Sequence, residues 1–185
     1  MSNAPGIRER ILDAAETVLR RDGALRLTQP EVARLAGVRQ SHLTYYFPRR
    51  TDLLAALATS FLDRTAASLD TLEREAAPGR DATLATIALV TRLIAEPDSM
   101  RAFLALIVEA DQDAQLRALL DMRMREFTAL IAGHLGRSET DPDVHLLLAA
   151  IRGFGLSNLL LGRSDAEQGV ALGERLGFLS SRDRP

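Results

Sequence analysis

The stretch LTQPEVARLAGVRQSHLTYYF, residues 27–47, decides the fold of this chain. It predicts two short helices joined by a tight turn. Thr28 is a favourable N-cap residue, and Glu31 follows three residues later, which is the pattern of a capping box. Gly37 tolerates the left-handed backbone that ends a helix at a sharp reversal. A second helix, about residues 40–46, follows after about three residues, which is the spacing of a helix-turn-helix.

The apolar residues of this stretch predict one shared core. Val32, Leu35 and Ala36 recur at helical spacing and form a stripe on the first helix. Leu43 and Phe47 lie on one side of the second helix, because each helical residue advances about 100° around the axis. They are suited to packing on the first helix, so the remaining side chains of the second helix are expected to face solvent.

That exposed face is polar and carries no carboxylate, so nothing on it repels phosphate. Its members are Gln40, Ser41, His42, Thr44, Tyr45 and Tyr46. A glutamine can pair with adenine through two hydrogen bonds, a serine can contact several base edges, and a tyrosine ring can meet a thymine methyl group. The pattern favours a DNA-reading helix; the alternative is an ordinary surface helix of an all-helical protein.

The charge of the chain is distributed unevenly. The 185 residues suit one domain, or a small domain joined to a larger one, and the formal net charge is −2. Residues 1–50 hold nine arginines against five acids, whereas residues 51–185 hold 14 arginines against 20 acids. A basic head on an acidic body is typical of a nucleic-acid-binding domain joined to a part that does not bind nucleic acid.

The composition argues against several other classes of protein. The chain has no cysteine, so it can form neither a disulfide framework nor a thiolate metal site. We expect a cytoplasmic protein without a membrane partner, because no signal peptide and no apolar run of about 18 residues is recognisable. No glycine-rich phosphate loop or nucleophile elbow is present, and His42, His134 and His145 are scattered. We therefore predict no enzyme, no catalytic residue, no metal site and no cofactor.

The rest of the chain continues in helical periodicity without strand alternation. Further helices are expected at about residues 5–21, 51–77, 81–95, 99–110, 113–135, 142–161 and 165–179. The predicted fold is all-α with about nine helices. We expect an N-terminal three-helix DNA-binding domain, residues 1–50, and a C-terminal helical domain for ligand binding and dimerisation, residues 51–185.

Residues 7–54 resemble the DNA-binding domain of TetR-type transcriptional regulators. The positions that carry the resemblance are Ile11, Ala14, Ala15, Gly23, Thr28, Val32-Ala33, Ala36-Gly37-Val38, Leu43, Tyr46-Phe47 and Leu53-Leu54. The resemblance implies a sequence-specific DNA-binding regulator, by default a repressor. It further implies that Thr28 and Arg50 contact backbone phosphate, that Gln40, Ser41 and Tyr45 contact bases, and that His42 and Tyr46 do either.

Three residues depart from the family's usual pattern at the recognition helix. Arg39 stands where serine is usual, Ser41 where glycine is usual, and Thr44 where the resemblance implies a phosphate-contacting tyrosine. A threonine hydroxyl can still meet a phosphate, although with a shorter reach. We include all three among the predicted DNA contacts and expect the operator preference to depend on them.

The last two predicted helices carry features that suit dimerisation. Residues 142–161 are more apolar than one inward stripe requires, and Gly169, Gly173 and Gly177 recur every four residues, which would permit close approach of another helix. The resemblance implies a homodimer through these two helices. Two-fold symmetry would place two recognition helices about 34–36 Å apart on a palindromic operator. The alternative is a helix pair buried within a monomer.

The resemblance also implies a small-molecule effector bound among the fourth to seventh helices. Flexible methionine and aromatic side chains there could line an adaptable apolar pocket. The candidates are Phe61, Met100, Phe103, Leu104, Ile107, Met122 and Phe127. We expect an apolar or amphipathic ligand that shifts the population away from the DNA-binding shape. The competing hypothesis is a helical small-molecule-binding protein that has lost DNA binding, which would leave the basic head unexplained.

Overall fold

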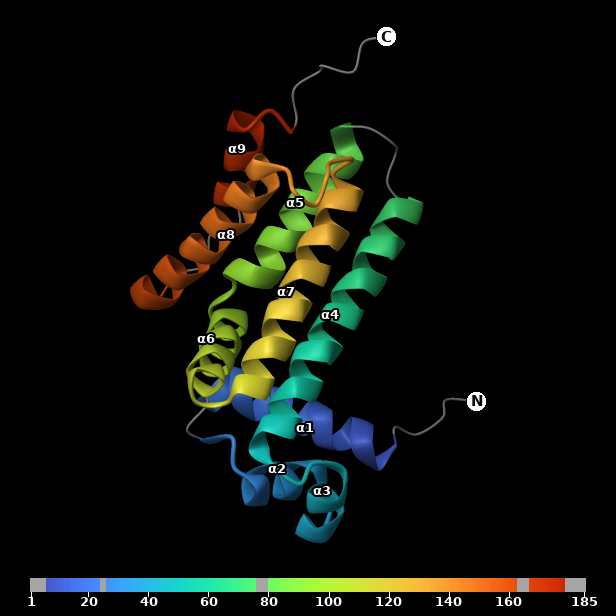
Figure 1. Cartoon of the computed structure of the whole chain (residues 1–185), viewed down its shortest axis with the longest axis vertical. Coiled ribbons are helices and arrows are strands. Elements are labelled where there is room, and N and C mark those ends of the chain that lie inside the picture. Colours follow the sequence, from blue (N-terminus) through green and yellow to red (C-terminus); the bar gives the residue numbers. More distant parts are fainter. Residues whose placement is uncertain (1–5, 24–25, 76–79, 163–166, 179–185) are drawn as a thin grey trace. The chain divides into compact units, whose positions relative to one another are not determined.

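The computed structural model describes residues 6–23, 26–75, 80–162 and 167–178, and the regular structure in these ranges is entirely helical. Figure 1 shows the described helices in chain order. They are α1 (Ile7–Asp22), α2 (Gln29–Ala36), α3 (Gln40–Tyr46), α4 (Arg50–Glu75), α5 (Arg80–Ala95), α6 (Pro97–Gln112), α7 (Ala114–His134), α8 (Pro142–Leu161) and α9 (Glu167–Arg175). The predicted all-α fold with about nine helices is confirmed.

The helix bounds follow local signals where those signals are strong. α3 and α8 begin and end where the sequence predicts. α6 begins at Pro97, two residues earlier than predicted, since proline is well tolerated in the first turn of a helix. α9 ends at Arg175, and Gly177 beyond it has a φ of +78°. The predicted helix ends at residues 5, 77, 165 and 179 lie outside the described residues.

The helices group into two compact units, which we describe separately. The first unit comprises Met1–Phe61 and Arg101–Asp121, and the second comprises Leu62–Met100 and Met122–Pro185. α4, α6 and α7 each contribute residues to both units. The predicted division into residues 1–50 for DNA binding and 51–185 for ligand binding concerns function, and it stays a prediction.

The first unit is built on the packing of α1, α2 and α3 against one another. Ile11, Val18 and Leu43 are completely buried in its core. The start of α4 joins this core through Leu53 and Leu54, and α6 and α7 add smaller contributions. Burial of such side chains, at about 1.5–3 kcal/mol each, holds the helix-turn-helix rigid.

In the second unit α5 packs against α8 and α9. The glycines of α9 face α5 of the same chain. A Cβ atom built on Gly169 would lie 1.9 Å from Oγ1 of Thr91, and one built on Gly173 would lie 2.6 Å from Cδ1 of Ile87. The glycine repeat therefore does bring another helix close, but that helix is α5. Gly177 lies beyond the end of α9.

By length and composition α8 is the helix of the described chain that could cross a membrane, with a mean hydropathy of 1.6 over 18 residues, although Asp143 and Arg152 interrupt its apolar sequence. Core helices of water-soluble proteins meet the same criteria, so this property alone does not indicate a membrane protein. One face of α8 is buried through Val144, Leu147, Leu148 and Ile151.

Candidate nucleic-acid interface

The helix-turn-helix begins at a side-chain cap on α2. Oγ1 of Thr28 accepts a hydrogen bond from the backbone N–H of Glu31 at 3.4 Å. The capping box is only half formed: the Glu31 carboxylate pairs with Arg34 at 2.6 Å, and the Thr28 N–H donates to the carbonyl of Arg26. The reciprocal contact is lost because the nearby guanidinium is the stronger donor for a carboxylate. Gly37 ends α2 with a φ of +63°, as predicted.

Replacement of Thr28 by alanine is expected to lower the free energy of unfolding by about 0.5–2 kcal/mol, because the N-terminal N–H groups of α2 lose their side-chain acceptor. Urea unfolding followed by circular dichroism measures this change. Thr28→Ser, which keeps the acceptor, is the control. Equal stability of Thr28→Ala and the parent chain would contradict the cap.

The packing of α2 and α3 confirms most of the predicted core. Leu43 is completely buried and Phe47 is 3% exposed. On α2, Val32 and Ala36 are buried as predicted, but Leu35 is 38% exposed, which corrects its assignment to the core. Ala33, which the predicted stripe omitted, is buried and occupies the core-facing position next to Val32.

All the predicted DNA-contacting side chains of α3 are exposed, namely Gln40, Ser41, His42, Thr44, Tyr45 and Tyr46. Tyr45 is 80% exposed and Tyr46 is 40% exposed, and their rings meet edge to face with centroids 5.2 Å apart. The Thr44 hydroxyl donates to the carbonyl of Gln40 at 2.9 Å. The face therefore presents an amide, two phenols and an imidazole without a carboxylate.

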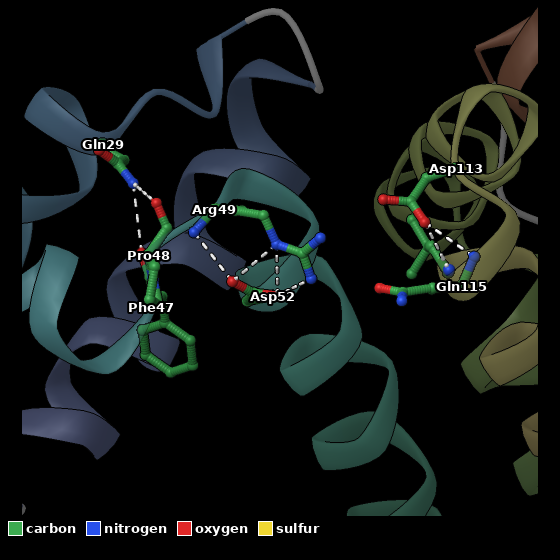
Figure 2. Close-up of polar contacts among 8 residues, drawn as sticks. Gln29, Phe47, Pro48, Arg49, Asp52, Asp113 and Gln115 are labelled. Atoms are coloured by element: carbon green, nitrogen blue, oxygen red, sulfur yellow. Dashed lines mark hydrogen bonds and ion pairs between the residues drawn. The ribbon is translucent and has the colours of Figure 1, made fainter.

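The connection from α3 to α4 is held by polar contacts that the sequence analysis missed. Nε2 of Gln29 donates to the carbonyls of Phe47 and Pro48 at 3.3 and 3.2 Å (Figure 2). Asp52 accepts the backbone N–H of Arg49 at 2.9 Å and pairs with its guanidinium at 2.7 Å. The hydrogen bond from the Arg49 guanidinium lowers the pKa of the Asp52 carboxyl below its ordinary value. The three-residue spacing of Arg49 and Asp52 is the local pattern that could have predicted this cap.

The start of α4 is also tied to α6 within the first unit, and α7 begins at a side-chain cap. Arg50 pairs with Glu109 of α6 at 2.5 Å, so the predicted phosphate contact is held by a carboxylate here. Asp113 accepts the N–H groups of Gln115 and Leu116 at 2.9 and 3.0 Å, and this lowers its pKa (Figure 2). Glu109 lies 59 residues from Arg50, so no local pattern could have indicated the pair.

The predicted effector-pocket residues do not all belong to one compact unit. Phe61, Phe103, Leu104 and Ile107 belong to the first unit, and Met100, Met122 and Phe127 belong to the second. Met100 and Phe127 are buried, whereas Met122 is 39% exposed and Ile107 is 46% exposed. The pocket stays a prediction.

The second unit has an open groove of about 560 Å³ between α4 and α5. It is lined by Arg64, Ala67, Ser68, Thr71, Leu72, Glu75, Leu89 and Arg92. None of these is a predicted pocket residue. Two arginines and two hydroxyl side chains give the groove a more polar character than the predicted pocket.

No cluster of three or more histidine, aspartate or glutamate side chains is placed to hold a metal ion within the ranges that the structure describes. Two of the three histidines contact different partners. Nδ1 of His134 lies 3.5 Å from the Glu73 carboxylate, and Nε2 of His145 lies 2.8 Å from the Glu139 carbonyl.

Two protein families match this chain in succession. The family described as bacterial regulatory proteins of the tetR family matches residues 11–57. The family described as tetracyclin repressor-like, C-terminal domain, matches residues 78–176, which is more than half of the chain. The chain belongs to the TetR family. All nine predicted DNA contacts of this TetR-family chain, from Thr28 to Arg50, fall within the residues that match the N-terminal domain of the family.

Individual relatives agree with this membership. The HTH-type transcriptional regulator BetI of Rhizobium meliloti (strain 1021) is 32% identical over 117 residues, which is 63% of this chain. The match spans 58% of BetI, less than two thirds of its length. A solved structure of an assigned transcriptional regulator from Streptomyces coelicolor A3(2) is 26% identical and covers 93% of this chain and 98% of its own, with a TM-score of 0.68. The structure of the multidrug binding protein EbrR complexed with imidazole is 26% identical. The match covers 93% of this chain and 95% of EbrR, with a TM-score of 0.61.

Proposed function

We propose that this TetR-family chain is a sequence-specific DNA-binding transcriptional regulator, a dimeric repressor that a small apolar or amphipathic ligand releases from a palindromic operator. The observation that carries the proposal is the face of α3. Leu43 and Phe47 anchor this short helix in the core, while Gln40 and Tyr45 face solvent without a nearby carboxylate on the helix. A rigid helix with base-pairing side chains can enter the major groove.

The predicted contacts divide into two roles. Gln40, Ser41 and Tyr45 read base edges, and His42 and Tyr46 contact either bases or phosphates. Thr28, Thr44 and Arg50 position the protein on the backbone. Because Arg50 pairs with Glu109, a DNA phosphate must compete with that carboxylate for the guanidinium. This competition makes the strength of DNA binding depend on the α6 side chain.

The homodimer in this proposal forms through α8 and α9. Exposed residues on α8 alternate at spacings of three and four: Leu146, Ala149, Gly153, Leu156 and Leu160. This is the period of a seam between paired helices. Leu146 is 52% exposed, Leu156 is 42% and Leu160 is 76%, so a second copy of the chain would remove considerable apolar surface from water.

The effector in this proposal is a small apolar or amphipathic molecule. EbrR, a relative of similar fold, is a multidrug binding protein. A ligand that binds better to the released shape would lower the population of the DNA-binding shape. A thermal-shift screen of apolar cations, acyl compounds and neutral aromatics identifies the class of effector. No enzymatic activity, cofactor, metal or membrane partner belongs to the proposal, and the expected location is the cytoplasm.

Fluorescence anisotropy with DNA from upstream of the chain's own gene tests the proposal at two salt concentrations. We expect specific binding. A plot of the logarithm of the binding constant against the logarithm of the salt concentration should have a slope of about −0.9 for each phosphate neutralised. The alternative, a ligand-binding protein that has lost DNA binding, predicts no specific complex at either concentration while the thermal-shift response to ligands is kept.

Two substitutions separate base contacts from phosphate contacts. Tyr45→Ala is expected to weaken operator binding by about tenfold while leaving binding to unrelated duplex nearly unchanged, because a lost base contact affects only the cognate sequence. Arg50→Ala is expected to weaken binding to both duplexes alike and to reduce the salt slope by about one. Melting temperatures of the variants control for folding. Equal losses on both duplexes for Tyr45→Ala would refute base contact.

A further inference from the structure

Arg39 differs from its neighbouring arginines because the described part of the chain supplies no acidic partner for it. Residues 31–50, all described, contain four arginines. Arg34 pairs with Glu31 at 2.6 Å, Arg49 with Asp52 at 2.7 Å, and Arg50 with Glu109. The exposed side chain of Arg39 pairs with no carboxylate of the described chain, and it makes no side-chain cap hydrogen bond. Its guanidinium is therefore available to a ligand without breaking an existing ion pair.

The backbone of Arg39 is nevertheless fixed at the start of α3. Arg39 is the N-cap residue, with φ −71° and ψ 145°, and its carbonyl accepts the N–H groups of His42 and Leu43 at 2.9 and 3.3 Å. Leu43 is completely buried, so this end of α3 is held to the core. An exposed side chain thus extends from a fixed backbone position beside Gln40, at the end of the recognition helix that contacts base edges in this motif.

The neighbouring side chains of α3 indicate which base this guanidinium would contact. Gln40 offers the donor and acceptor pair that adenine requires, and the tyrosine rings offer apolar surface to thymine. A guanine presents two adjacent acceptors, O6 and N7, in the major groove, and a planar fork of donors satisfies both. Between Val38 and Pro48, Arg39 supplies the one such fork.

We propose that Arg39 reads a guanine in each operator half-site through two hydrogen bonds to O6 and N7. This inference rests on the proposed function, and it assigns sequence specificity to a residue that departs from the family's usual serine. A bidentate contact of this kind discriminates against other bases by about 5- to 150-fold in affinity.

Selection from a randomised duplex library with the wild-type chain, Arg39→Ala and Arg34→Ala tests the proposal. The wild type and Arg34→Ala are expected to enrich the same motif, including a fixed guanine in each half-site. Arg39→Ala is expected to lose the preference at that position alone. Its affinity for the wild-type motif should fall about 5- to 150-fold, while binding to unrelated duplex is unchanged.

Replacement of that guanine by 7-deazaguanine, which lacks the N7 acceptor, should weaken the wild-type complex and leave the Arg39→Ala complex unaffected. The inference is overturned if Arg39→Ala weakens all duplexes equally and lowers the salt slope by about one, since that marks a phosphate contact. It is also overturned if the motif keeps its guanine preference without Arg39. A wild-type chain that enriches no motif would overturn the proposed function itself.

Discussion

Gly169→Ala is expected to destabilise the second unit by about 1–3 kcal/mol, because the new methyl group would overpack a tight helix contact. The added Cβ would lie 1.9 Å from Oγ1 and 2.8 Å from Cβ of Thr91. Thr91 is completely buried, and its hydroxyl donates to the carbonyl of Ile87 at 2.7 Å. The threonine cannot rotate away without losing that bond, and its Cβ cannot move without its backbone.

Urea unfolding of matched glycine variants measures this effect. Gly133→Ala in α7 is the control, since its added Cβ meets nothing within 4 Å, and it should stabilise the chain by up to about 1 kcal/mol. Gly173→Ala should be less costly than Gly169→Ala, because its nearest neighbour is the terminal methyl group of Ile87. Thr91→Ala should partly rescue Gly169→Ala. A stabilised Gly169→Ala chain would show that α5 and α9 are not packed this closely.

Leu160→Glu is expected to convert the proposed dimer into a folded monomer and to abolish tight operator binding. Leu160 is 76% exposed on α8, so the substitution removes little packing within the described part of the chain. Across a two-fold axis the change removes two leucine side chains from the interface, at about 1.5–3 kcal/mol each. The dimer dissociation constant should therefore rise by about 10²- to 10⁴-fold.

Sedimentation velocity and anisotropy on one preparation measure assembly and DNA binding together. Val108→Glu is the matched control, because Val108 is 64% exposed on α6 and lies outside the proposed seam. It should remain dimeric and bind operator. A Leu160→Glu chain that stays dimeric at low concentration would exclude this face of α8 as the interface.

The sequence predicts those parts of the fold that depend on local chemistry. The bounds of α8 follow from Asp141, whose side chain accepts the Asp143 N–H at the start, and from Gly162, which adopts a φ of +62° at the end. The turn at Gly37 is predictable for the same reason. The exposed face of α3 follows from the periodicity of Leu43 and Phe47 alone.

The features that the sequence does not predict depend on contacts between distant segments. Helical spacing indicates that Gly169 and Gly173 allow close approach, but it cannot say that α5 is the neighbouring helix. The pairing of Arg50 with Glu109 joins residues 59 positions apart. The exposure of Leu35 also depends on tertiary packing. Apolar residues spaced three to four positions apart mark one side of a helix, but the spacing does not fix which edge of that side meets the core.

Selection of genomic fragments by the purified wild-type chain tests the central claim, that a dimer of this protein reads a specific DNA sequence through α3. The account predicts an enriched palindromic motif whose half-sites lie about 10–10.5 base pairs, or a multiple of that distance, apart. Substitution of Tyr45 should alter the motif. A chain that is folded and dimeric but enriches no sequence over the input library would contradict the account.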